Sequence, residues 1–94
     1  MKAIWNNKII AESNDTILVE GNHYFPQNSL TKNYFTNSTM HTTCPYKGKA
    51  SYFNVNVDRE NNENAAWYYP APKTGYEKIS GHVAFWRGVV IEQD

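Results

Sequence analysis

The chain has one cysteine and no excess of either charge. A single cysteine among 94 residues excludes an internal disulfide framework and an all-cysteine zinc site. Nine basic and nine acidic side chains cancel, which excludes a basic arm wrapped on a phosphate backbone. No apolar run approaches the ~20 residues that cross a bilayer. We therefore expect neither a nucleic-acid partner nor a membrane partner.

We also expect no secretory leader. Met1 leads directly into patterned sequence without a signal-peptide apolar region. Together with the single thiol, this predicts a reduced, cytoplasmic protein. A length of 94 residues predicts a single domain over residues 1–94.

No window of a dozen residues carries a helical stripe of apolar side chains, whereas period-two alternation is frequent. The large pieces of the core must be aromatic, because the chain has three Trp, seven Tyr and four Phe. Its asparagines lie among aromatic and β-branched residues, and asparagine favours tight turns. These features indicate a folded chain of strands and turns.

The first half of the chain predicts a hairpin and a separate strand. Residues 2–5 and 8–11 flank Asn6-Asn7, and both asparagines tolerate the left-handed φ of a primed two-residue turn. Residues 16–20 form the next strand, which Gly21-Asn22 ends. Residues 27–40 carry the weakest pattern, with one helical turn at Ser29-Leu30 and a short strand at 34–36 as candidates.

The second half predicts further strands and a closing hairpin. In the strand over residues 50–57, Ser51, Phe53, Val55 and Val57 share one face. Another strand spans residues 64–69, and residues 82–86 and 89–92 form a hairpin around Arg87-Gly88. The predicted fold is all-β with little or no helix, a single compact antiparallel sandwich or partly closed barrel of about eight short strands.

The turn over residues 44–48 contains the first group of candidate reactive side chains. Cys44 lies three residues before Lys47, and a nearby ammonium group stabilises a thiolate. The backbone N–H groups of such a turn form an anion nest, to which Lys47 adds charge. The alternative is that Cys44 is a small buried hydrophobe and Lys47 a solvated turn residue.

Two other segments contribute candidate residues. In the strand over residues 64–69, Trp67 and Tyr69 share a face, and the neighbouring alanines leave room for a ligand or for core packing. In residues 82–86, Val83 and Phe85 face inward and His82 lies on the opposite face, as an acid or base or as a structural histidine. Metal-ligand spacing is limited to His41-x-x-Cys44, so we expect no metal and no cofactor.

Three blocks resemble a known bacterial family. Residues 43–52, Thr-Cys-Pro-Tyr-Lys-Gly-Lys-Ala-Ser-Tyr, resemble the T-x-C-P-Y-K-G-x-A-x-Y signature of the family called domain of unknown function 427. Residues 64–72 and 79–85 are similar to two further blocks of that family, and residues 9–13 and 20–26 match upstream positions. The resemblance implies a small, mostly β, stand-alone cytoplasmic domain. Some collections describe this family as nucleotidyltransferase-like.

Three functions stay open from the sequence. The first is a small-molecule binding module, in which an aromatic pocket beside the 44–48 turn holds an anionic or nucleotide-like ligand. Its ligand-binding residues would be Thr43, Tyr46, Lys47, Tyr52, Trp67 and Tyr69. The second is an enzyme that uses Cys44 as nucleophile or redox thiol, with Lys47 and His82 as the other catalytic residues. The third is a homodimeric protein-interaction module that pairs through a sheet edge or an aromatic patch.

Overall fold

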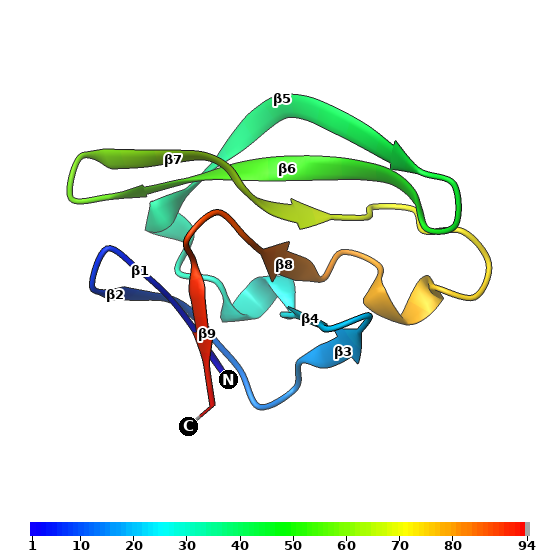
Figure 1. Cartoon of the computed structure of the whole chain (residues 1–94), viewed down its shortest axis with the longest axis horizontal. Helices are drawn as coiled ribbons and strands as arrows, with labels where there is room; N and C mark the ends of the chain where they lie inside the picture. The colour runs from blue at the N-terminus through cyan, green and yellow to red at the C-terminus, as the bar shows by residue number, and fades with distance from the viewer. Residues whose placement is uncertain (94) are drawn as a thin grey trace.

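The computed structural model describes residues 1–93, and antiparallel strands make up most of it (Figure 1). Within this range the strands are β1 (Lys2–Trp5), β2 (Lys8–Glu12), β3 (Ile17–Val19), β4 (Asn22–Tyr24), β5 (Phe35–Cys44), β6 (Gly48–Val57), β7 (Glu60–Tyr68), β8 (Val83–Phe85) and β9 (Val90–Glu92). Single 3₁₀ turns η1 (Gln27–Ser29), η2 (Lys32–Tyr34) and η3 (Glu77–Ile79) are the helical pieces of this part of the chain. The predicted all-β fold is confirmed. None of these short turns has the length and apolarity needed to cross a membrane.

The strands form three sheets, of which the four-stranded sheet β5-β6-β7-β8 is the largest. Its long strands run across the upper part of Figure 1, above the sheet β2-β1-β9 and the hairpin β3-β4. The hairpin is joined to β8 just beyond the end of β4. There Phe25 and Val83 exchange both backbone hydrogen bonds, at 2.7 and 2.8 Å. Residues far apart in the sequence thus meet at one edge of the large sheet.

Two tight hairpins follow from residues that accept positive φ. Asn6 and Asn7 have φ of 50° and 64°, and they connect the registered pair Trp5 and Lys8, as the sequence predicts. The turn between β3 and β4 has Glu20 at φ 52° and Gly21 at φ 82°. This second turn leaves the Glu20 side chain at the tip of a hairpin.

The segment with the weakest sequence pattern contains a long strand. The structure has η1 near the predicted helical turn, but the strand that begins at Phe35 continues to Cys44 rather than ending at residue 36. The register between β5 and β6 shifts between Asn37 and His41. Because this irregularity interrupts the alternation of side chains, period-two patterning misses the strand.

The predicted closing hairpin is wrong. The chain does turn at Arg87 and Gly88, with φ of 54° and 84°, but β8 pairs with β7 and β9 pairs with β1. Val89 and Ile91 pack against the core that β1 covers. Burial of these side chains draws β9 away from β8 and into the smaller sheet.

Two clusters of buried side chains hold the sheets together. The first core cluster lies between the large sheet and β2-β1-β9, and its buried members are Ala3, Ile10, Ala11, Phe25, Val55, Val57, Ala65, Ala66, Val83 and Phe85. The second core cluster lies between the large sheet, the β3-β4 hairpin and η3, and its buried members are Tyr24, Ala50, Tyr52, Tyr69, Ile79 and Ala84. The first is mainly aliphatic, whereas the second is rich in tyrosine.

Alternation along the strands divides residues between the two clusters. In β8, Val83 and Phe85 belong to the first core cluster, and Ala84 between them belongs to the second. The same division separates Phe25 from Tyr24. Because successive side chains of a strand point to opposite faces, β8 is a wall with a core cluster on each side.

Removal of the Phe25 ring should destabilise the fold strongly. Phe25 is fully buried and contacts Phe85 edge to face, with ring centroids 5.4 Å apart. We expect Phe25→Ala to lower the free energy of unfolding by about 3–5 kcal/mol, as measured by urea denaturation. Leu18→Ala is the control, because Leu18 is 59% exposed, and its cost should stay below about 0.5 kcal/mol. Equal costs for the two variants would contradict this role of Phe25.

Candidate functional site

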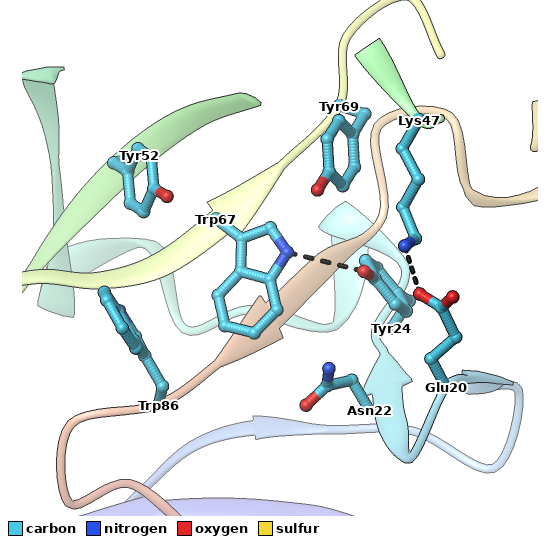
Figure 2. A pocket seen from close by; sticks show the side chains of 8 residues that line it. All are labelled: Glu20, Asn22, Tyr24, Lys47, Tyr52, Trp67, Tyr69 and Trp86. Atoms are coloured by element: carbon cyan, nitrogen blue, oxygen red, sulfur yellow. Dashed lines mark hydrogen bonds and ion pairs between the residues drawn. The ribbon is translucent and has the colours of Figure 1, made fainter. Parts of the chain in front are cut away.

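An open cleft of about 200 Å³ lies on the tyrosine-rich side of the large sheet. Its walls come from the β3-β4 hairpin, the turn after β5, strands β6 and β7, and the residues after β7 and β8 (Figure 2). The lining residues are Glu20, Asn22, Tyr24, Lys47, Tyr52, Trp67, Tyr69 and Trp86. Five of the eight are aromatic, so the cleft is a ring-walled site with a polar margin.

A row of registered residues across three strands forms the back of this site. Tyr52 of β6 lies opposite Trp67 of β7, and Trp67 lies opposite Ala84 of β8. Ala84 is fully buried. The register thus places Trp67 between Tyr52, which also lines the cleft, and Ala84, which is buried in the second core cluster.

Two of the aromatic walls stand nearly at right angles to the central ring of Trp67. The ring of Trp67 makes interplanar angles of 88° with Tyr24 and 82° with Trp86, at centroid distances of 6.3 and 6.0 Å. The Trp67 indole N–H donates to the Tyr24 hydroxyl at 3.4 Å. These edge-to-face contacts are the geometry that ring quadrupoles favour, and they fix the central indole in place.

An ion pair closes one margin of the cleft. The Lys47 ammonium donates to the Glu20 carboxylate, which reaches it from the tip of the β3-β4 hairpin (Figure 2). Lys47 is 8% exposed, whereas the Glu20 side chain is 61% exposed. The hydrogen bond that Lys47 donates to the carboxylate raises the pKa of Lys47. The lysine charge is therefore compensated within the protein, and the carboxylate keeps an accessible side.

Burial changes the acidity of two tyrosines in the lining. Desolvation raises the pKa of Tyr69 to about 12 and also raises the pKa of Tyr24, against the opposing effect of the Trp67 hydrogen bond. Both hydroxyl groups remain protonated across the physiological range, so each can donate a hydrogen bond.

The turn that carries Lys47 is fixed by a neighbouring segment. Lys73 donates its backbone N–H to the Lys47 carbonyl at 2.8 Å and its ammonium to the Pro45 carbonyl at 3.0 Å. Gly48 has φ of 113°, and a Cβ there would lie 3.4 Å from the Ala71 carbonyl oxygen. The left-handed backbone, rather than the distance, is what favours glycine at this position.

The Cys44 sulfur faces the same turn rather than the cleft. Its Sγ accepts the Lys47 backbone N–H at 3.4 Å. The backbone N–H groups of Lys47 and Tyr46 hold the pKa of the thiol below its ordinary value. Cys44 itself packs against the second core cluster and does not line the cleft.

The structure brings together four of the residues that the sequence assigns to a site: Lys47, Tyr52, Trp67 and Tyr69. The other four, Thr43, Cys44, Tyr46 and His82, lie outside the lining. Tyr46 is 73% exposed on the turn, and Thr43 is exposed on β5. The His82 ring lies 3.2 Å from the Ser80 carbonyl oxygen.

Four lining residues were not assigned by sequence reasoning: Glu20, Asn22, Tyr24 and Trp86. Three of them come from the β3-β4 hairpin, whose place beside the large sheet depends on the distant contact with Val83. The sequence could have indicated Trp86. In the alternating pattern of residues 82–86 it lies on the same face as Ala84, opposite the inward-facing Val83 and Phe85.

The described residues hold no evident metal centre, since within residues 1–93 no three His, Cys, Asp or Glu side chains gather closely enough to bind an ion. The fold and the cleft define the class of the protein as a small all-β domain with an aromatic-walled surface site. The sequence profile NTP_transf_9, described as a domain of unknown function (DUF427), matches residues 1–93, and the chain belongs to this family. A comparison with curated proteins gave no match.

The thiol of Cys44 should ionise at a lower pH in the folded protein than in the unfolded chain. Since backbone N–H groups stabilise the thiolate, the pH midpoint for alkylation by iodoacetamide should shift downward on folding. Alkylation rates across pH, followed by intact mass, measure both midpoints, and the same chain in urea is the control. A native midpoint at or above the unfolded one would contradict the role of these N–H groups.

Proposed function

We propose that the chain binds a small, ring-containing molecule in the cleft. The observation that carries this proposal is the convergence of five aromatic side chains around one open space, from segments that are distant in the sequence. Ligand sites are typically concave, with mostly apolar or aromatic walls and a few polar groups that orient the ligand. Here the polar groups are those of Glu20, Asn22 and Lys47 and the Tyr69 hydroxyl.

The size of the cleft limits the size of its ligand. Sites for drug-sized molecules have volumes of about 300–1,000 Å³. A volume of about 200 Å³ therefore suits one ring with its substituents, and larger parts of a ligand would extend into solvent.

Surface exposure supports a binding role over simple core packing. Trp86 borders the cleft with 42% of its surface exposed, and Glu20 is also largely exposed. Close packing is the rule in protein interiors. The three lining tyrosines are buried behind the cleft, but an exposed tryptophan at the margin of an open space is typical of a recognition surface.

The positions of the candidate catalytic groups favour binding over catalysis. Neither Cys44 nor His82 lines the cleft, and the Cys44 sulfur is engaged by backbone N–H groups. Nucleophilic catalysis needs a nucleophile and a base within hydrogen-bond reach of each other and of the substrate. Among the lining residues, Lys47 is already paired with Glu20.

The carboxylates of the site do not fit metal-assisted nucleotidyl transfer. Such chemistry relies on carboxylates that hold Mg²⁺ against the phosphates. The cleft has one carboxylate in its lining, that of Glu20, and it is paired with Lys47. The proposal is therefore limited to recognition of a ligand.

Binding should be visible at two of the three tryptophans. A panel of ring-sized molecules that includes sugars, heteroaromatic rings and organic ammonium ions would be titrated into ¹⁵N-labelled protein. We expect at least one class to shift the indole N–H signals of Trp67 and Trp86, which line the cleft. The Trp5 signal is the internal control, because Trp5 packs against the first core cluster.

A pair of variants localises the binding. Trp86→Ala should weaken the binding of such a hit about tenfold, because it removes one aromatic wall. Tyr46→Ala is the matched control, since this exposed ring is close in sequence to Lys47 but lies outside the lining. If no molecule shifts either indole, or if both variants lose affinity equally, the cleft is not the binding site.

A further inference from the structure

The charges at the cleft argue against a charged ligand. Lys47 and Glu20 form an ion pair, so the lining contributes one positive and one negative group that compensate each other. The N–H groups of the turn are directed at the Cys44 sulfur and are not free to hold an anion. An anionic ligand would therefore have to displace Glu20 to reach a compensating charge.

A cationic ligand meets an obstacle of the same kind. The aromatic walls alone would favour an organic cation. However, the Arg87 guanidinium already lies 4.7 Å from the centroid of the Trp86 ring. This positive charge beside one aromatic wall opposes a second cation on the same ring. The charge distribution therefore favours an uncharged ligand.

The angle between the walls bears on the shape of the ligand. A flat heteroaromatic ring that is sandwiched between two side chains needs parallel rings. The two ring contacts within the lining, those of Trp67 with Tyr24 and with Trp86, are instead at 88° and 82°, so neither is a parallel pair. A corner of perpendicular walls accommodates a thicker, saturated ring, which presents C–H groups to one ring face and polar groups along its edge.

Unused hydrogen-bonding groups surround this corner. Within residues 1–93, neither the Asn22 amide nor the Tyr69 hydroxyl makes a side-chain hydrogen bond. No buried polar side-chain atom of the described chain lacks a partner, so the Tyr69 hydroxyl must reach accessible space. Figure 2 shows the hydroxyl end of Tyr69 directed toward Trp67, whereas the Tyr52 hydroxyl is already hydrogen-bonded to the Thr42 hydroxyl at 2.9 Å. The Glu20 carboxylate also has lone pairs beyond the one that Lys47 uses.

We infer that the cleft recognises an uncharged saccharide ring. This inference rests on the proposed binding function and specifies its ligand class. A pyranose has an apolar C–H face that packs on an indole, and hydroxyl groups that donate and accept along the ring edge. Those hydroxyls match the mixed set of acceptors and donors at Glu20, Asn22 and Tyr69. The volume of about 200 Å³ suits one such ring.

Three sugars with the same ring test the charge preference. The probes are neutral methyl pyranosides, the corresponding uronates and the corresponding amino sugars, each titrated while the Trp67 and Trp86 indole N–H signals are followed. We expect a neutral pyranoside to shift both signals, and its uronate to bind at least about tenfold more weakly because the added charge lacks a partner. The Trp5 signal should stay in place.

A variant of Asn22 tests the polar contacts without breaking the ion pair. Asn22→Ala should weaken binding of the neutral pyranoside about tenfold by removing one hydrogen-bonding group. Its melting temperature should not fall, because the amide makes no hydrogen bond within the described residues. Tyr46→Ala should leave both affinity and melting temperature unchanged.

The outcomes separate the two proposals. Binding by heteroaromatic rings, uronates or ammonium ions without binding by neutral pyranosides overturns the saccharide assignment and leaves the cleft as a binding site. Unchanged affinity of Asn22→Ala for a neutral pyranoside also overturns it. If no probe of any class shifts the Trp67 or Trp86 signal, the binding function itself fails.

Discussion

The cleft depends on one short contact, the reciprocal backbone hydrogen bonds between Phe25 and Val83. These bonds attach the β3-β4 hairpin to the edge of the large sheet, and the hairpin carries Glu20, Asn22 and Tyr24. Without that attachment, Trp67 would lose its contact with Tyr24, and Lys47 would lose the Glu20 carboxylate. The same contact places Phe25 in the first core cluster and Tyr24 in the second, so the stability of the fold and the geometry of the site are coupled.

Local features of the fold could be predicted from the sequence because their causes are local. The Asn6-Asn7 hairpin follows from residues that tolerate positive φ, and the turn over residues 44–48 follows from proline and glycine at fixed positions. The alternation of side chains in residues 82–86 likewise predicts that Val83 and Phe85 share one face, and both belong to the first core cluster. The resemblance to the DUF427 family was visible in the same local blocks and is confirmed over residues 1–93.

Other features are set by contacts that no short window contains. The register shift of β5 interrupts its alternation, and β9 pairs with β1 rather than with its neighbour in sequence. The partner of Lys47 lies 27 residues away on another hairpin. Four of the eight lining residues could therefore be predicted from the sequence. The hairpin residues Glu20, Asn22 and Tyr24 could not, because their place beside the large sheet depends on the distant contact between Phe25 and Val83.

The pairing of β1 with β9 also bears on the order of folding. The first and last strands of the described chain lie side by side, and the β1-β2 hairpin is closed by a two-residue turn (Figure 1). Local hairpins form before contacts between distant segments, because closing a long loop costs conformational entropy. The three-stranded sheet is thus completed only when β9 docks, and on a ribosome β1 and β2 must wait until residues 90–92 emerge to obtain their third partner.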